Sequence, residues 1–182
     1  MLNTIQNVDI GILNYIQEYI KNPFLDKIMP FITSLGNLSF IWIVIGILLL
    51  RIKKYRKYGF MIFLSLILCG LIGNIILKPI VARMRPFDIY PLIDGLLIKI
   101  PKDYSFPSGH TMSSFAPIVV LLYFNRKIGV CALIIGSLIA FSRLYLYVHY
   151  PSDVFAGMVI GIINGIIAIF VIEKEFTNKC KA

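Results

Sequence analysis

The 182-residue sequence contains few charged residues and very few acidic ones. Charged side chains make up 15% of the chain, with 9 Asp and Glu against 18 Lys and Arg, and there are only 2 histidines. The three cysteines lack the close spacing of a zinc site or a disulfide framework, since they are Cys69, Cys131 and Cys180. The sequence also lacks an Asp-x-Asp cluster of the kind that holds magnesium. We therefore expect no metal, no other cofactor and no disulfide-stabilised fold.

Long apolar runs dominate the rest of the sequence. Hydrophobic residues are 58% of the chain, the mean hydropathy is +0.84, and the runs occupy residues 28–50, 58–77, 111–124, 128–148 and 154–172. About 20 helical residues at 1.5 Å each cover the roughly 30 Å hydrocarbon core of a bilayer. A soluble domain of this size cannot bury five such runs. The pattern therefore predicts one all-α integral membrane domain over residues 1–182, a bundle of five transmembrane helices.

The first 27 residues differ from these runs. Residues 9–20, DIGILNYIQEYI, have the apolar spacing of an amphipathic helix. Such a helix lies on a membrane surface, and a sixth, partial span over residues 6–22 is also compatible with the pattern. We assign residues 1–27 to an N-terminal amphipathic segment and residues 58–172 to the core that carries the motifs below.

The positive charges are grouped in a way that indicates orientation in the membrane. Five basic residues lie in residues 51–57, two in residues 125–127 and three in the tail after residue 172. By the positive-inside rule these segments face the cytoplasm, so the long 79–109 connection and the short one near residues 147–152 face outward. Because no nucleic-acid motif accompanies the basic residues, nucleic acid is not an expected partner. Attraction to anionic lipids is a second, compatible interpretation.

Three groups of polar residues fall on the outward side of this topology. The first is KPIVARMRP, residues 78–86. Lys78 and Arg85 are seven residues apart, so on one helix they would share a face about 10 Å apart. Pro79 would kink that helix and Pro86 would end it. By itself the group is more typical of cationic side chains that extend to the membrane edge.

The second group is PSGH, residues 107–110. Ser108 after Pro107 is typical of an N-cap, and a helix that begins near Gly109 lengthens the short apolar run that follows into a span. The N–H groups of Gly109 and His110 would then face one spot where the helix dipole favours an anion, and Gly109 would let a ligand approach closely. A plain helix cap explains Ser108 and Gly109 equally well, but it gives no reason for His110.

The third group is SRLYLYVHYPSD, residues 142–153. Pro151 argues against one unbroken helix, so we expect one helix to end near Tyr147 and another to begin near Pro151. Asp153 would then accept a hydrogen bond from one ring nitrogen of His149, which fixes the tautomer and raises the basicity of the other nitrogen. The alternative is a histidine and an aspartate that only cap the helix.

Taken together, the three groups suit a phosphoryl group. They bring three cations, Lys78, Arg85 and Arg143, to the same side of the membrane as helix N–H donors and both histidines. Guanidinium groups bind phosphate oxygens in bidentate fashion, and a cationic cage stabilises the charge of the transition state. The two imidazoles would supply a nucleophile and an acid.

This combination resembles the type 2 phosphatidic acid phosphatase family, whose pattern is K-x-x-x-x-x-x-R-P, then P-S-G-H, then S-R-x-x-x-x-x-H-x-x-x-D. All three parts match without a gap, in residues 78–86, 107–110 and 142–153, and the resemblance covers about residues 58–172.

The resemblance implies a role for each matching residue. His149 would be the nucleophile that forms a phosphohistidine, Asp153 would orient it, and His110 would protonate the leaving oxygen and then activate water. The phosphate would be held, without a metal, by Lys78, Arg85, Ser108, Gly109 and Arg143. The pattern does not require Arg83, which we interpret as a rim charge paired with Asp88 or with lipid headgroups.

The resemblance also implies a bacterial enzyme, multi-pass in the cytoplasmic membrane, with its active site on the extracellular side, a lipid phosphate as substrate and no obligate protein partner. Small members of the family commonly act on undecaprenyl diphosphate, which is the expected substrate here, with phosphatidylglycerophosphate and phosphatidic acid as alternatives. A small lipid transporter or scramblase, in which the cations line a path, would keep its flux after His149→Ala. Soluble vanadium haloperoxidases share the phosphate-binding pattern, but the apolar runs argue against them.

Overall fold

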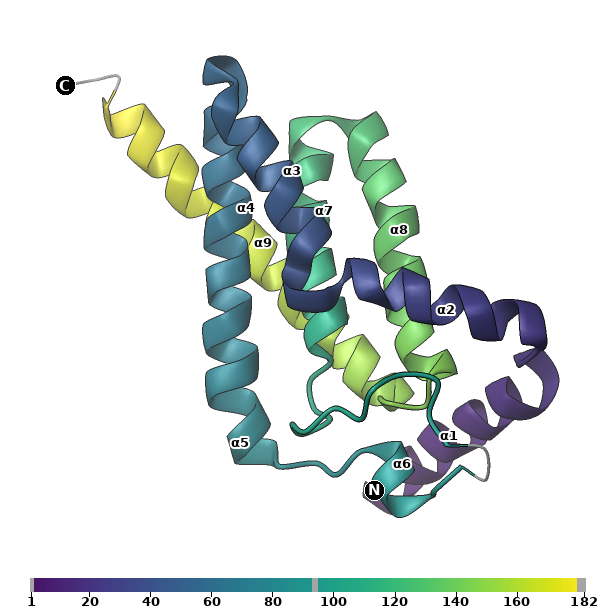
Figure 1. Ribbon diagram of the computed structural model, residues 1–182. Coiled ribbons are helices and arrows are strands. Elements are labelled where there is room, and N and C mark those ends of the chain that lie inside the picture. The colour runs from purple at the N-terminus through teal and green to yellow at the C-terminus, as the bar shows by residue number, and fades with distance from the viewer. Residues whose placement is uncertain (1, 93–94, 180–182) are drawn as a thin grey trace.

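The computed structural model describes residues 2–92 and 95–179, and in this part of the chain all regular structure is helical. The helices in chain order are α1 (Leu2–Tyr15), η1 (Ile16–Ile20), α2 (Pro23–Leu35), η2 (Asn37–Ser39), α3 (Phe40–Arg51), η3 (Lys53–Tyr55), α4 (Arg56–Cys69), η4 (Gly70–Leu77), α5 (Lys78–Val81), α6 (Pro86–Ile89), α7 (Gly109–Phe124), α8 (Arg126–Tyr145) and α9 (Pro151–Lys179). The predicted all-α fold is confirmed. The long helices run together from one end of the molecule to the other (Figure 1).

Each of the five predicted apolar runs forms helix, with one correction. By length and composition, three helical stretches can cross a membrane, Lys53–Ile89, Arg126–Tyr145 and Pro151–Asn178, and the bent pair α2–α3 makes a fourth. The run predicted at residues 28–50 is not one straight helix, because α2 and α3 meet at 49°. Leu38 and Ser39 at this bend have φ values of 50° and 59°, which no helix interior accommodates. Helix α7 is apolar but has only 16 residues.

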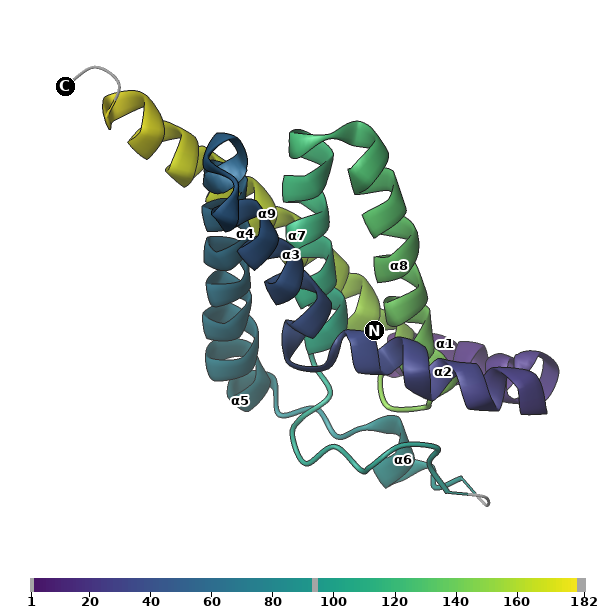
Figure 2. The same ribbon diagram turned by 45° about the horizontal axis from the view of Figure 1, so that its top comes forward.

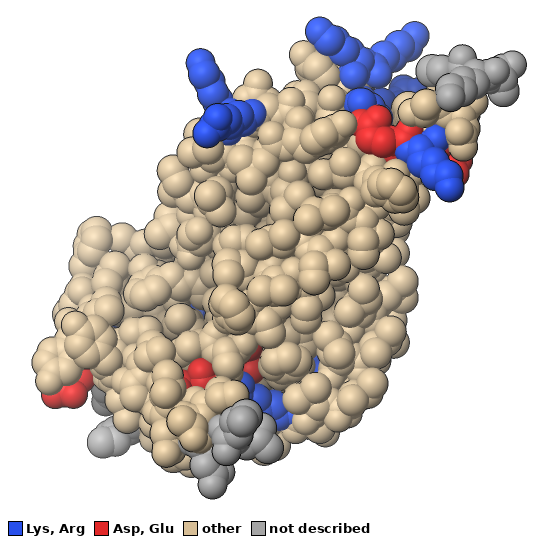
Figure 3. All heavy atoms as spheres, turned by 180° about the vertical axis from the view of Figure 1, so that it is seen from behind, with Lys and Arg blue, Asp and Glu red and all other residues tan. Residues whose placement is uncertain are grey.

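The outer surface of the bundle is apolar, as a lipid environment requires. Large hydrophobic side chains point outward from the long helices, for example Ile67 on α4, Ile134 on α8 and Phe170 on α9, which are 57%, 58% and 70% exposed. On the face shown in Figure 3 the charged side chains gather toward the two ends and leave an uncharged zone between them. An exposed apolar belt between charged ends is the surface of a membrane-spanning protein.

Helix α7 occupies the centre of the bundle and packs against α4, α8 and α9 (Figures 1 and 2). Gly157, Gly161 and Gly165 form a stripe on α9 that faces α7. A Cβ atom on any of the three would lie between 2.5 and 2.7 Å from a backbone oxygen of α7 or of Ser108, the residue before it. Stripes of small residues at four-residue spacing let two membrane helices approach backbone to backbone. This contact fixes the beginning of α7, which carries PSGH, beside the first turns of α9.

The two ends of the bundle differ as the charge pattern predicts. The basic segments at residues 51–57 and 125–127 and the end of α9 lie together at one end (Figure 1, top). The beginning of α7, the α8–α9 turn, α5 and α6 lie at the other end (Figure 1, bottom). All three motif groups are therefore at the end opposite to the basic segments.

The N-terminal amphipathic segment is helical, as predicted. Its buried face carries Asp9, Leu13 and Ile16, and Leu13 packs against Tyr147 and Tyr150 of the α8–α9 turn. Helix α1 therefore lies against the protein at the same end as the motif groups (Figure 2). The placement of its outer face on the membrane surface stays a prediction.

Candidate active site

A cavity of about 450 Å³ opens at this end of the bundle. Its walls carry most of the residues that the sequence singles out: Lys78, Arg85, Gly109, His110, Arg143 and His149. Because these residues come from α5, the segment before α6, α7, α8 and the α8–α9 turn, only the folded bundle brings them together. Ser108 and Asp153 are fully buried immediately behind the wall.

Lys78 and Arg85 do not share a helix face, so that prediction is wrong. The helix ends at Val81, and Ala82 then takes a left-handed conformation with φ 46°. Arg85 is extended, with φ −78° and ψ 158°, and stands at the N-terminus of α6. The two cations nevertheless converge, because both bind Asp103.

Asp103, on the loop before α7, binds two of the cationic side chains that the sequence analysis assigns to phosphate binding. Its carboxylate forms an ion pair with Lys78 Nζ and another with Arg85 NH2 at 2.7 Å, and its backbone oxygen accepts from Arg85 Nε at 2.8 Å. Burial alone would raise the pKa of Asp103, but the two cations outweigh it and lower the pKa to about 2. The carboxylate thus stands where an anionic substrate would bind. Sequence reasoning missed it, although an acid between two cationic motifs was a usable signal.

His149 is 2% exposed and is oriented by contacts on both ring nitrogens. Arg85 NH1 lies 3.2 Å from Nε2. A guanidinium can only donate, so this contact requires a lone pair on Nε2 and a proton on Nδ1. Burial lowers the pKa of His149 to about 3; the Asp153 carboxylate opposes this and the cations of Arg85 and Arg143 reinforce it. The imidazole is therefore neutral at neutral pH, with its lone pair on the cavity side.

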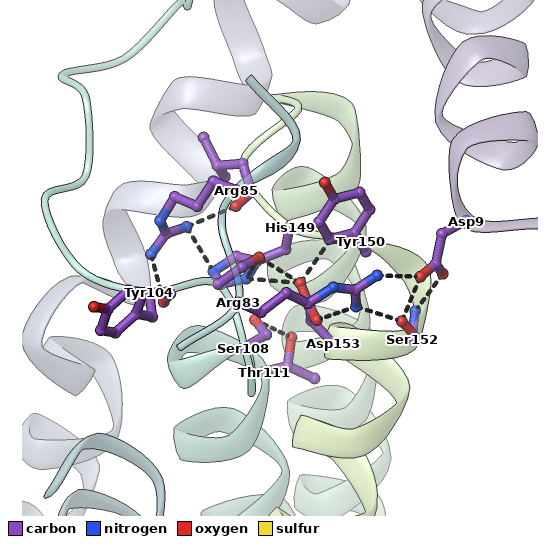
Figure 4. Close-up of polar contacts among 12 residues, drawn as sticks. Asp9, Arg83, Arg85, Tyr104, Ser108, Thr111, His149, Tyr150, Ser152 and Asp153 are labelled. Carbon is purple, nitrogen blue, oxygen red and sulfur yellow. Dashed lines mark hydrogen bonds and ion pairs between the residues drawn. The ribbon is translucent and has the colours of Figure 1, made fainter. Parts of the chain in front are cut away.

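Asp153 lies beside His149 (Figure 4), but the hydrogen bond predicted between them is not made directly, and Ser105 contacts both side chains. The Asp153 Oδ2 atom is 3.7 Å from His149 Nδ1, which is longer than a hydrogen bond. The Ser105 hydroxyl donates to the same Oδ2 at 2.5 Å and lies 3.4 Å from Nδ1. Ser105 is fully buried, and no motif had drawn attention to it. The carboxylate is thus linked to the ring through the Ser105 hydroxyl and stands close enough to stabilise a positive charge on it.

The PSGH group begins a helix, as predicted, with Ser108 before the first residue of α7. The Ser108 hydroxyl faces Thr111 Oγ1 at 2.9 Å, so its expected contact with phosphate stays a prediction. The Ser108 N–H donates to the backbone oxygen of Asp153 at 3.1 Å, which joins the second motif to the third. A Cβ at Gly109 would stand 3.8 Å from Lys78 Nζ, in the space that a ligand of this lysine needs.

The bend between α2 and α3 adds two residues that sequence reasoning missed. Asn37 Oδ1 lies 2.9 Å from His110 Nε2, and Thr33 Oγ1 accepts from Arg143 NH1 at 2.6 Å. Both residues also line the cavity. Arg143 is 3% exposed, and its buried Nε has no partner among the residues that the structure describes. An unpaired buried guanidinium nitrogen at a cavity wall is suited to receive an anionic ligand.

Arg83 is not a rim charge paired with Asp88, which corrects the interpretation from sequence. Asp88 instead accepts from the backbone N–H of Arg85 at 3.3 Å, as part of the cap of α6. Arg83 binds Asp153 Oδ1 at 2.6 Å and Asp9 Oδ2 at 2.7 Å. The motif does not require Arg83, so its sequence pattern gave no signal for these contacts.

No cluster of three or more His, Cys, Asp or Glu side chains suited to a metal ion occurs among residues 2–92 and 95–179. The expectation of a metal-free reaction stays a prediction. The donor set at the cavity is cationic, and such a set fits an anion.

The fold and the site together define the class: an all-helical membrane protein with a cationic pocket that carries two histidines. The sequence model of the PAP2 superfamily matches residues 54–176. The chain belongs to this family and is a membrane phosphatase. The predicted resemblance is confirmed.

Named relatives and solved structures agree with this assignment. An undecaprenyl-diphosphatase of Sulfolobus acidocaldarius is 33% identical over 86% of this chain and 75% of its own length. Undecaprenyl-diphosphatase BcrC of Bacillus subtilis is 35% identical over 79% of this chain and 73% of its own length. The crystal structure of a transmembrane PAP2-type phosphatidylglycerolphosphate phosphatase from Bacillus subtilis aligns with a TM-score of 0.77 and 27% identity, over 94% of this chain and 88% of that one.

Proposed function

We propose that the protein hydrolyses undecaprenyl diphosphate to undecaprenyl phosphate and inorganic phosphate, through a phosphohistidine at His149. The observation that carries this proposal is the convergence of Lys78, Arg85, Arg143 and both histidines on one cavity. The cavity suits a charged phosphate group, and an adjoining cavity of about 320 Å³ continues along α4 past Leu66 and Gly70, where a lipid chain can lie. The choice of lipid follows the relatives named undecaprenyl-diphosphatase.

Substrate binding begins with an exchange of anions. The terminal phosphate takes the place of the Asp103 carboxylate on Lys78 and Arg85, and Arg143 donates its unpaired Nε. A phosphate with more charge than one carboxylate and with bidentate geometry favours this exchange.

In the first chemical step, the Nε2 lone pair of His149 attacks the terminal phosphorus. The bond between phosphorus and the bridging oxygen breaks, and His110, which takes up a proton once the phosphate anion lies among the cations, gives that proton to the bridging oxygen, so undecaprenyl phosphate leaves. The imidazole now carries phosphorus on Nε2 and its proton on Nδ1, and Asp153 and Ser105 stabilise the positive charge. The cations around the cavity stabilise the transferring phosphoryl oxygens.

In the second step, water attacks the same phosphorus and the P–N bond breaks. His110 takes the proton from the water, and the His149 ring regains its lone pair on Nε2. Inorganic phosphate leaves, and both histidines return to their initial protonation states. Asn37, bonded to His110 Nε2, holds the acid-base imidazole in place during both steps.

A second candidate substrate is phosphatidylglycerophosphate. Phosphatidylglycerophosphatase B of Bacillus subtilis is 30% identical over 98% of this chain and 88% of its own length. Phosphate release by the purified protein from undecaprenyl diphosphate, phosphatidylglycerophosphate and phosphatidic acid separates these candidates. We expect the highest kcat/KM for undecaprenyl diphosphate, with no change when a chelator is added. Much faster release from either phospholipid would overturn the choice of substrate, and inhibition by the chelator would count against the metal-free mechanism.

We also propose that the site faces the outside of a bacterial cytoplasmic membrane, because the basic segments lie at the opposite end of the bundle (Figure 1). In a variant without the native cysteines, Lys102→Cys marks the site end and Lys54→Cys the basic end. A membrane-impermeant thiol reagent added to intact spheroplasts should label the first cysteine alone. Labelling of the second alone would reverse the orientation.

A further inference from the structure

Arg83 makes four side-chain hydrogen bonds at the site end of the bundle, and Figure 4 shows those to Asp9, Ser152 and Asp153. Its NH1 donates to Asp153 Oδ1 at 2.6 Å and to Ser152 Oγ at 2.7 Å. Its NH2 donates to Asp9 Oδ2 at 2.7 Å and to Gln6 Oε1 at 2.6 Å. One guanidinium group thus joins the beginning of α9 to α1, two segments about 140 residues apart in sequence.

Asp9 completes this connection from the side of α1. It is 2% exposed, and its Oδ1 accepts from the Ser152 N–H at 2.9 Å while its Oδ2 accepts from the Ser152 hydroxyl. A carboxylate in such a place is costly unless it is paired and hydrogen-bonded, and Arg83 supplies the charge. The Arg83 guanidinium also lies over the Tyr150 ring, 3.8 Å from its centroid, which restricts it further.

The two oxygens of Asp153 have different partners. Oδ1 faces Arg83, whereas Oδ2 accepts from Ser105 and from the Tyr150 N–H at 2.9 Å and faces His149. The bond to Arg83 thus holds Oδ1 while two other bonds hold Oδ2, and together they fix the rotation that directs Oδ2 at the imidazole. Without Arg83, only the bonds to Oδ2 would restrain the carboxylate about its χ2 torsion, which is a broad and soft one.

We propose that Arg83 and Asp9 are positioning residues that form a latch between α1 and the Asp153 carboxylate and thereby hold His149 in its reactive orientation. The inference rests on the proposed role of His149 as nucleophile. The inference gives the N-terminal helix a part in the reaction, although this helix lies outside the segment that the family model matches. Neither residue contacts the cavity reserved for the phosphate, so both act through Asp153.

If the latch acts through Asp153, its loss should change the pH dependence of the reaction, which loss of a merely structural contact would not do. The charged or titratable groups that face His149 or share its cavity are Arg85, Arg143, Asp153, Lys78, Lys99, Asp103 and His110. Without the Arg83 cation, the negative charge of Asp153 is less neutralised and acts more strongly on His149, so the imidazole becomes easier to protonate. The acidic limb of the pH profile of kcat/KM should therefore move to higher pH, while KM changes little because the phosphate contacts remain.

The experiment uses Arg83→Gln, Arg83→Lys and Asp9→Asn in the full-length protein, assayed with the lipid phosphate that it hydrolyses fastest. Two variants at the same end serve as controls for the change in net charge: Lys21→Gln removes one positive charge, as Arg83→Gln does, and Glu18→Gln removes one negative charge, as Asp9→Asn does. Neither Lys21 nor Glu18 has a side-chain partner among the described residues. We expect kcat to fall about 10- to 100-fold in Arg83→Gln, with KM within about twofold and the acidic limb raised by about half a pH unit or more. Arg83→Lys should restore part of kcat, because it keeps the charge.

The double variant Asp9→Asn with Arg83→Gln tests whether the two residues act as one unit. We expect it to lose no more activity than Arg83→Gln alone, because each change breaks the same latch. A folded Arg83→Gln protein with wild-type kcat and pH profile would overturn the proposal. The proposal would also be overturned if the activity losses of the two single variants added in the double variant while the pH profile stayed unshifted. Arg83 and Asp9 would then only stabilise the fold.

His149→Ala, assayed beside these variants, separates this proposal from the proposed function. If His149→Ala still releases phosphate at the wild-type rate, the phosphohistidine mechanism fails, whatever Arg83 does. If His149→Ala is inactive while the latch variants behave like the wild type, only the latch fails.

Discussion

Replacing Asp103 by Asn should tighten the binding of phosphate, because its carboxylate holds the same cations that the substrate needs. The two cations lower the pKa of Asp103 from 3.8 to about 2, a shift equivalent to about 2 kcal/mol. The side chain is 52% exposed, so solvent screening reduces this to about 1 kcal/mol, or about fivefold in affinity. The carboxyl is ionised above about pH 2, so the competition persists across the physiological range and is lost only as the pH falls toward that value.

The assay is inhibition of phosphate release by inorganic phosphate and by orthovanadate, with KM measured in the same series. Asp103→Asn should lower both inhibition constants and KM about fivefold. Asp103→Glu keeps the anion and should remain close to the wild type. Glu18→Gln removes one negative charge at the same end, away from the cavity, and controls for the change in net charge. Unchanged or weaker inhibition in Asp103→Asn would refute the competition and make Asp103 a brace for the two cations.

Three further predictions follow from single contacts. Nitrogen-15 NMR of the two histidines, with His110→Gln to assign them, should show His149 neutral and protonated on Nδ1 from about pH 8 to pH 5. Burial and the nearby cations keep the pKa of His149 well below 6.5, so titration of its ring near pH 6.5 would contradict the structure. Asn37→Ala should lower kcat about tenfold, less than loss of His110 itself, and an unchanged kcat would exclude Asn37 from orienting that imidazole. Gly161→Ala places a Cβ 2.5 Å from the backbone of α7 and should destabilise the protein by about 1–3 kcal/mol in detergent. Gly11→Ala is the control, because a Cβ at Gly11 has nothing within 4 Å and should not destabilise the protein. Equal thermal stability of the two variants would contradict the packing of α9 against α7.

The sequence predicted the architecture because long apolar runs and grouped basic residues follow from the bilayer itself. The start of α7 at Gly109 and the break between α8 and α9 were also predictable, since Ser108 and Pro151 are strong local signals. Other features depend on contacts that no local pattern carries. The helix that should have aligned Lys78 with Arg85 ends early, and a distant loop residue then joins the two cations.

The residues that sequence reasoning missed lie far from the motifs that they support. Thr33 and Asn37 reach the cavity only because α2 and α3 meet at a bend inside one apolar run. Asp9 had a usable signal: it shares with Leu13 and Ile16 one buried stripe along α1 and the start of η1, where a carboxylate needs a partner. Arg83 is the natural partner for such an acid, but a motif that does not require it gave no reason to look.

Direct detection of a phosphorylated histidine tests the central claim. The protein is mixed with undecaprenyl diphosphate radiolabelled in its terminal phosphate, or with the lipid phosphate that it hydrolyses fastest, and is quenched in base during turnover. The mechanism predicts label on the wild-type protein that is stable to base and released by acid, as a P–N bond requires, and none on a folded His149→Gln variant. Label on His149→Gln at the wild-type level, or continued turnover by that variant, would contradict the account.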